Sequence, residues 1–509
     1  MAKLNRKKLG LHGSVAVAVT VLVMAAVILL NAIFGALADR YGWYVDMNPT
    51  LEYPATDAFY TYVDTYVMSE LEGTENTVRI LFCEEEESLL ASDETMLVLS
   101  AAKELSERYP ERVRIEYLDI VAEPRQAREY GVDASTDVVV VCGDRSKVCS
   151  LEEFYMLEGS NVSTPVAYRG HRRFATVLRT VVSRELPVCY VTTNHGETFP
   201  DNEMMYAVAD AGYDARRLDS LSDGIPADCA LLLTYNPDRD FTDEDGVAGK
   251  SEIAELRAYM ENGGRYMVFV SADTFSFGGF PHLEGFLSEW GVAFEHKKGT
   301  EGREDCYLVR DPGHALSTDG YTVLARADDS ESAKTVLAPA LEGGDLTVML
   351  GNATVIRPAE GFGDNGKGQT TKGNVTVTPL LSSFAGAEAW VSGRAVDRAG
   401  DDGYTFMTLS ERGAGEKSGY LLACSSIEFA CEDSMQSAVF DNKTVFMSVV
   451  QAMGKDDVPL HIQPQPISDS TIRTMTTAQA KTVTWVAVAV PAVAMLAAGL
   501  IVLSRRKYS

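Results

Sequence analysis

Two stretches of the chain alternate short apolar runs with longer segments in which apolar residues recur at helical spacing. In the first stretch the strands are predicted at residues 78–83, 113–120 and 137–143, and the helices at 94–110 and 124–132. One helical segment ends at a proline and the other is closed by a glycine, which are ordinary stop signals. This order predicts a small α/β domain over residues 60–180.

The second stretch predicts a larger α/β domain over residues 185–455. Its strands are predicted at 187–193, 225–237 and 265–273, and its helices at 202–213 and 251–264. A strand pattern returns at 419–430 and a helical one at 442–454. Residues 295–380 lose the helical period, so we predict a β-rich insertion there.

Near each end of the chain lies an apolar, uncharged segment that is long enough to cross a bilayer. Residues 15–38 and 483–503 each exceed the roughly 20 residues that span a hydrocarbon core of about 30 Å. Basic residues lie in the tail 1–14 before the first segment and in the tail 504–509 after the second. The positive-inside rule predicts that both tails are cytoplasmic and that the region between the helices is extracytoplasmic. The polar residues 456–482 would then form a stalk.

Each apolar end has an alternative interpretation. Ala36-Leu37-Ala38 resembles a signal-peptidase site, so the first segment could be a cleaved signal peptide, although its apolar run is longer than usual. The second segment could be a buried helix, but its terminal position and the closing Arg505-Arg506-Lys507 favour a membrane anchor.

Charge narrows the range of partners. The formal net charge is −28, and no basic patch occurs between the apolar ends, so nucleic acid is not expected as a partner. No cofactor or metal is predicted either. The loop GFGDNGKG (361–368) has the spacing of a P-loop, but Gly368 stands where Ser or Thr must reach the magnesium ion.

Candidate chemistry is concentrated where the predicted strands of the second domain end. Asn194, His195, Gly196 and Glu197 follow the first of these strands in the sequence CYVTTNHGETF. Asn236 and Asp273 end the next two predicted strands. Ligands of open α/β sheets bind at the carboxyl ends of strands, so these six residues are candidates for a ligand- or partner-binding site.

Three interpretations of the His195/Glu197 pair stay open. As metal ligands the two residues lack a third at helpful spacing, and as an acid/base pair they lack an evident nucleophile, because Cys189 and Cys229 lie in or beside strands. As a structural turn, Gly196 would permit a positive φ and Glu197 would cap the next helix. We expect a loop side chain such as His195 to carry little core packing.

The first domain resembles a thioredoxin-like fold in its order of elements and in the stretch VRIEYLDIVAEPRQAREYGVDASTDVVVVCG. CEEEES (83–88) replaces the C-x-x-C motif after the first strand, and glutamates beside Cys83 should raise its thiol pKa. We therefore interpret this domain as redox-inactive. A Cys142–Cys149 disulfide across a hairpin stays open as an alternative, as does a redox role for that pair.

The chain also resembles the Gldg family, which comprises auxiliary proteins of ABC transporters named from gliding motility. The resemblance rests on VCYVTTNHGETF, LLLTYNPDRDFTDED, EIAELRAYMENGGRYMVFVSAD, VTPLLSSFAGAEAW, SSIEFA and DNKTVFMSVVQAM, in this order, with an apolar segment at each end. Asn194 departs from the family's usual glycine. The resemblance implies a thioredoxin-like domain and a glutamine-amidotransferase-like domain without its catalytic cysteine, both between two transmembrane helices.

The resemblance implies a non-ATPase accessory subunit in the plasma membrane of a bacterium. Its partners would be an ABC permease, a separate ATPase subunit and the lipid bilayer. The alternative is a membrane-tethered hydrolase or amidotransferase-like enzyme that uses His195 and Glu197.

Overall fold

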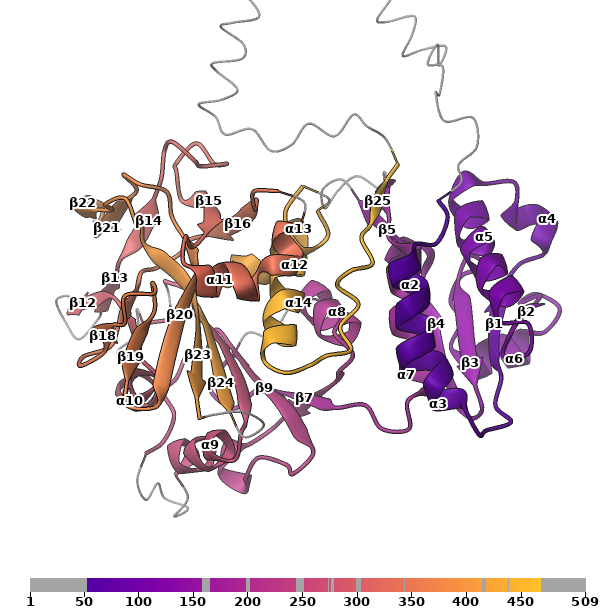
Figure 1. Ribbon diagram of the computed structural model, residues 1–509, viewed down its shortest axis with the longest axis horizontal. Helices are drawn as coiled ribbons and strands as arrows, with labels where there is room; N and C mark the ends of the chain where they lie inside the picture. The colour runs from indigo at the N-terminus through magenta and orange to yellow at the C-terminus, as the bar shows by residue number, and fades with distance from the viewer. Residues whose placement is uncertain are drawn as a thin grey trace, which may run out of the picture. The chain divides into compact units, whose positions relative to one another are not determined.

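The computed structural model describes most of the chain between its two apolar ends (Figure 1). The described residues are 53–157, 165–197, 202–243, 251–272, 274–275, 279–298, 304–342, 344–413, 418–437 and 439–467. The predicted transmembrane segments 15–38 and 483–503 lie outside these residues. Within the described ranges, none of the helices combines the length and the apolar character that crossing a membrane requires.

The first sheet has four strands in the order β2-β1-β3-β4. They are β1 (Val78–Phe82), β2 (Val113–Tyr117), β3 (Val138–Cys142) and β4 (Arg145–Cys149). β1 runs parallel to β2 and antiparallel to β3, and β3 and β4 form a hairpin. All five residues of β3 are buried, which explains its unbroken run of valines.

Helices α5 (Asp93–Arg108), α6 (Pro124–Tyr130) and α7 (Gly170–Val182) accompany this sheet, and α7 contacts β3 and β4. Gly131 ends α6 with φ of 75°, a left-handed conformation that glycine adopts without strain. The predicted α/β character of this region is confirmed.

The second sheet follows the path β16-β15-β20-β23-β24-β10-β9-β7-β8. Its parallel strands are β7 (Val188–Thr192), β8 (Asp214–Leu218), β9 (Cys229–Tyr235), β10 (Arg265–Phe269) and β24 (Gly419–Cys424). Antiparallel strands extend it on the β24 side: β15 (Thr322–Ala327), β16 (Val348–Gly351), β20 (Val375–Ser382) and β23 (Thr405–Arg412).

Helices cover both faces of the parallel strands (Figure 1). Leu231 and Leu233 of β9 belong to the core shared with α8 (Asn202–Asp210) and α14 (Asn442–Ala452). Leu232 points to the opposite core, which it shares with α9 (Glu252–Glu261) and α10 (Pro281–Glu289). Alternate residues of a strand face opposite sides, so a strand buried on both faces must be apolar throughout.

Residues 295–380 are only partly as predicted. The region is rich in strands, and β15, β16 and β20 join the main sheet. It also contains two short helices, α11 (Glu331–Val336) and α12 (Ala338–Leu341), that the sequence pattern did not indicate. Each is less than two turns long, so neither has room for a recognisable apolar repeat.

The segment predicted as a stalk begins with residues that pack onto the α/β region. β25 (Gln465–Pro466) pairs with β6 (Pro165–Tyr168), and Val458, Leu460 and Ile462 are buried. Residues 458–462 belong to none of the helices or strands, so this part of the chain packs as an irregular segment before β25. Residues 468–482 of that segment lie outside the described residues.

A buried group of charges links three helices that are distant in sequence. Asp210 of α8 accepts a hydrogen bond from Arg173 of α7 at 3.1 Å and forms an ion pair with Lys443 of α14. Arg173 also pairs with Glu153. Burial alone would raise the pKa of Asp210, but the nearby cations hold it well below its usual range.

We predict that Asp210→Ala destabilises the protein by about 3–5 kcal/mol, because it leaves Arg173 and Lys443 buried without their shared counter-ion. Thermal unfolding of the purified full-length chain checks this. The control is Asp214→Ala, which removes an exposed ion pair with Arg216 and should leave Tm nearly unchanged. Equal melting of the two variants would show that the buried cluster does not hold the three helices together.

Candidate functional site

The predicted site lies at the carboxyl edge of the second sheet. β7 ends at Thr192 and the chain turns through Asn194, His195, Gly196 and Glu197. The turn after β9 lies against it, because the backbone N–H groups of residues 238 and 239 donate to the His195 carbonyl, each at 2.9 Å. Two of the three predicted strand ends are therefore neighbours.

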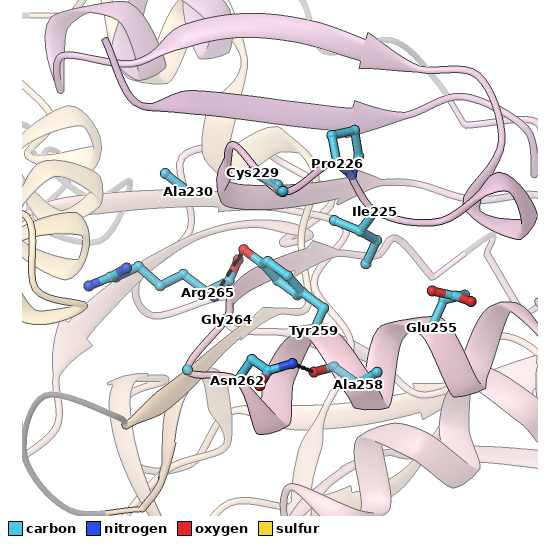
Figure 2. A pocket seen from close by; sticks show the side chains of 12 residues that line it. Ile225, Pro226, Cys229, Ala230, Glu255, Ala258, Tyr259, Asn262, Gly264 and Arg265 are labelled. Atoms are coloured by element: carbon cyan, nitrogen blue, oxygen red, sulfur yellow. Dashed lines mark hydrogen bonds between the residues drawn. The ribbon is translucent and has the colours of Figure 1, made fainter. Parts of the chain in front are cut away.

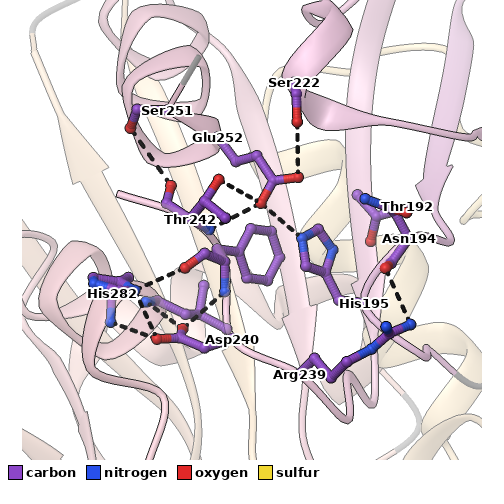
Figure 3. Close-up of polar contacts among 12 residues, drawn as sticks. Thr192, Asn194, His195, Ser222, Arg239, Asp240, Thr242, Ser251, Glu252 and His282 are labelled. Carbon is purple, nitrogen blue, oxygen red and sulfur yellow. Dashed lines mark hydrogen bonds and ion pairs between the residues drawn. The ribbon is translucent and has the colours of Figure 1, made fainter. Parts of the chain in front are cut away.

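His195 is buried between two carboxylates. Its Nδ1 lies 3.1 Å from Oε1 of Glu197. Its Nε2 lies 3.0 Å from Oε2 of Glu252, at the start of α9 (Figure 3). The backbone N–H of His195 donates to the other oxygen of Glu197 at 2.6 Å. Only 4% of His195 is exposed, and the Glu197 side chain is fully buried.

The His195 ring is also held by an aromatic neighbour and by the tight turn at Gly196. The imidazole stacks on Phe241, with ring centroids 4.0 Å apart and an interplanar angle of 11°. Gly196 has φ of 74°, and a Cβ there would lie 3.0 Å from Cβ of Asp238. Gly196 is thus required both for backbone conformation and for the close approach of the next turn.

Glu252 has further donors besides the histidine. Oε2 accepts from the backbone N–H of Thr242 at 2.9 Å and from its hydroxyl at 3.0 Å, and Oε1 accepts from Ser222 at 3.3 Å (Figure 3). Glu252 therefore joins four segments of the chain: the turn after β7, the short helical turn after β8, the loop after β9 and the start of α9. A fully hydrogen-bonded buried carboxylate of this kind stabilises a structure.

The pKa shifts of His195, Glu197 and Glu252 all favour the charged forms of these side chains. Burial lowers the pKa of His195, but the hydrogen bonds to Glu197 and Glu252 outweigh it and raise the pKa above its ordinary value. Burial raises the pKa of both carboxyls, yet hydrogen bonds from His195 and neighbouring donors lower it overall. Because ionised carboxylates only accept, a carboxylate oxygen opposite each ring nitrogen favours the imidazolium form, in which both nitrogens donate.

This arrangement occupies the groups that acid/base chemistry would need. Both ring nitrogens of His195 are hydrogen-bonded, and the side chain of Glu197 has no surface open to solvent. A general base must reach the proton that it abstracts. The geometry thus favours the structural interpretation of NHGE. Among the described residues, no group of three or more His, Cys, Asp or Glu is placed to hold a metal ion.

One expectation for this turn was wrong. His195 is a buried, hydrogen-bonded residue rather than a loop side chain with little packing. Glu197 hydrogen-bonds to His195, and its predicted role as a cap of the following helix stays a prediction, because residues 198–201 before α8 lie outside the described residues. Sequence reasoning also missed Glu252 and Phe241, because nothing in the local pattern connects residues about fifty positions apart.

The other candidate residues lie along the same edge. Asn236 adopts φ of 52°, and its Oδ1 accepts from the hydroxyls of Ser271 and Thr274, each at 2.8 Å. Asn194 contributes its backbone carbonyl, which accepts from Arg239 at 3.4 Å. Asp273 lies outside the described residues. Asn236 thus joins two strand ends by hydrogen bonds internal to the protein.

A cavity of about 400 Å³ opens at the opposite edge of the sheet (Figure 2). Cys229 and Arg265, at the starts of β9 and β10, line it together with the last turn of α9. Tyr259 donates to the Arg265 carbonyl at 3.0 Å and accepts from its N–H at 3.1 Å. Burial raises the pKa of the Cys229 thiol to about 11, so it is not an activated nucleophile.

The cysteines exclude the disulfide considered above. Cys142 pairs with Arg145 and Cys149 pairs with Val138, so the two cysteines lie at opposite ends of the β3–β4 hairpin. The pKa of Cys83 is raised to about 11, as expected in direction, but the cause is burial and then Asp137 rather than the adjacent glutamates. Neither the Cys142/Cys149 hairpin nor the surroundings of Cys83 therefore bring two thiols together.

Comparison with known proteins adds little. No protein-family model and no curated protein matches the chain. Similar solved structures include the mmIFT52 N-terminal domain, at 12% identity and a TM-score of 0.35, covering 52% of this chain and 97% of that domain. Cytoplasmic Protein STM3548 from Salmonella typhimurium has 8% identity and a TM-score of 0.27, covering 52% of this chain and 98% of its own.

A third similar structure is the cold-adapted β-galactosidase from Rahnella sp. R3. It has 14% identity and a TM-score of 0.24, and the match covers 56% of this chain and 34% of the galactosidase. All three TM-scores are low, so these similarities carry no argument about fold or function.

We predict that replacing His195 by Gln destabilises the protein most between about pH 4.5 and 6.5. The raised pKa of His195 means that its contribution is complete below about pH 6.5 and is lost as the pH rises through the folded-state value. The lowered pKa values of Glu197 and Glu252 mean that their contribution is present above about pH 4.5 and is lost as the pH falls.

Within that pH window, His195→Gln should lower the free energy of unfolding by about 3 kcal/mol, because two buried carboxylates lose their cation. Melting of wild type and variant from pH 4 to 9 measures the difference. His461→Gln, which removes an exposed pair with Glu342, should change Tm at no pH. A His195→Gln effect that is the same at every pH would contradict the imidazolium assignment.

Proposed function

We propose that this protein is a membrane-anchored, non-ATPase accessory subunit of an ABC transport system, with an extracytoplasmic α/β region that contacts a partner. The proposal starts from the ordered resemblance to the Gldg family and from the apolar, positively flanked ends of the chain. The acidic charge of the whole chain is compatible with a soluble region outside the membrane.

The topology supports the finer assignment of two domains. In the first sheet, the order β2-β1-β3-β4 with β3 antiparallel to β1, followed by α7, is the arrangement expected of a thioredoxin-like domain. In the second, parallel strands with helices on both faces are expected of an amidotransferase-like sheet. We therefore propose both assignments.

The observation that carries the proposed role is the closed His195 group. In a sheet of this kind, the carboxyl edge is where a reactive side chain would meet its substrate. Here that edge is filled by Glu197, His195 and Glu252, which hydrogen-bond to one another and to backbone. The residues that most suggested acid/base chemistry thus serve as a structural link. We infer that the chain acts through its surfaces, which favours an accessory subunit over the hydrolase or amidotransferase-like alternative.

Co-purification tests the role directly. A tagged full-length chain, expressed from its own locus and extracted in mild detergent, should retain an ABC permease and a separate ATPase, identified by mass spectrometry. The control is a tagged membrane protein of similar abundance. Recovery of neither subunit, even after cross-linking in intact membranes, would contradict the proposed function.

Cysteine labelling tests the topology. Lys250→Cys should react with a membrane-impermeant maleimide in intact cells, whereas Asn5→Cys and Lys507→Cys should react only after permeabilisation. The wild-type chain gives the background, which should be small because five of its cysteines are buried. Labelling of position 5 or 507 in intact cells, or a mature N-terminus directly after Ala38, would contradict the two-anchor topology.

A further inference from the structure

The edge strand β2 combines outward backbone groups, which pair with no strand among the described residues, with exposed apolar side chains. It is the outermost strand of the first sheet on its side (Figure 1). The Arg112 carbonyl accepts from Val78 of β1 at 2.7 Å, and the Leu118 N–H donates to Phe82 of β1 at 2.8 Å. Successive residues of a parallel strand direct their backbone N–H and C=O groups alternately toward one neighbouring strand and toward the opposite side. Ile115 and Tyr117 therefore direct these groups away from β1.

The carboxyl end of β2 is also unusually apolar at the surface. Among the described residues, five large apolar side chains are exposed, and three belong to this end of the first sheet: Leu90 is 49% exposed, Tyr117 41% and Val121 86%. Tyr117 is held by a hydrogen bond to Glu86, one helical turn before Leu90. Exposed apolar residues that gather in this way mark an interaction surface.

Negative charge predominates in the loops beside these residues, whereas β2 itself exposes the cation Arg114. The loops 83–90 and 117–123 together contain Glu84, Glu85, Glu86, Glu87, Asp119 and Glu123, and neither contains Lys or Arg. Lys103 neutralises only Glu86, through an ion pair at 2.5 Å. The carboxylate of Asp119 accepts from the N–H of Val121 at 2.8 Å, so the apolar tip of the loop is held in a turn.

We propose that β2 binds an extended, basic segment of a partner protein, which adds to the sheet as a further strand. The free N–H and C=O groups of Ile115 and Tyr117 would form the new ladder. Leu90, Tyr117 and Val121 would accept alternate apolar side chains, and the acidic loops would attract lysine or arginine. A second copy of this chain fits less well, because it would bring like charge to the same place. The proposal does not depend on the transporter assignment.

Binding of a defined peptide to the full-length chain in detergent tests this inference. The probe is a short fluorescent peptide of alternating lysine and valine, and its counterpart alternates glutamate and valine. We expect saturable binding of the basic peptide alone. Ile115→Pro should weaken it at least about tenfold, because proline removes one outward donor while leaving every charge in place.

The controls separate strand addition from general attraction to an acidic protein. Ile115→Val keeps the donor and should bind like wild type, and melting of each variant confirms folding. Equal binding by Ile115→Pro and wild type would overturn the proposal, because charge alone would then explain the affinity. Equal binding of the glutamate peptide would overturn it as well.

Photo-cross-linking in native membranes locates the partner. A benzophenone amino acid at Val121 should capture a basic peptide of another protein, and Ile115→Pro should abolish that product. The same amino acid at Val396, which is 50% exposed on β22 (Arg394–Arg398), serves as the control. Cross-links from position 121 only to a second copy of the chain would overturn the proposal in favour of self-association.

Discussion

The second α/β region depends on one buried cation. The imidazolium of His195 lies between Glu197, two residues away, and Glu252, at the start of α9. Burial opposes the charge on the ring, and the two carboxylates outweigh it; the ring and neighbouring donors in turn favour the ionised carboxylates. The turn after β7, the loop after β9 and the first turn of α9 are therefore fixed relative to each other by a single group.

A similar charge arrangement occurs where α7 meets α8 and α14. Asp210 is shared by Arg173 and Lys443, and Arg173 reaches back to Glu153. In both places a central ion of one sign lies between two ions of the other, so removing the centre leaves more uncompensated charge than removing either flank. Such groups add directional contacts to apolar packing, which by itself is non-directional.

Sequence reasoning succeeded where local pattern determines structure. The apolar runs of β1, β3, β7, β9 and β10 and the amphipathic period of α5 and α9 are properties of neighbouring residues, and the α/β class follows from their order. It failed where distant residues decide the outcome. The NHGE turn suggested exposed chemistry because Glu252 and Phe241, which bury the ring, are about fifty residues away. Residues 456–467 suggested a stalk because their pairing partner, β6, lies almost three hundred positions earlier.

The two sheets differ in what they leave open. The carboxyl edge of the second sheet is filled by its own polar groups: Asn236 accepts from Ser271 and Thr274, and His195 bonds to its flanking carboxylates. The first sheet ends in β2, whose outward backbone groups have no neighbouring strand among the described residues. An open strand edge favours aggregation unless charge protects it. The glutamates after β1 supply such protection against acidic and neutral chains, yet the same charge attracts a basic one. Under the proposed strand addition, the glutamates of CEEEES (83–88) make this edge selective for the charge of the chain that pairs with it.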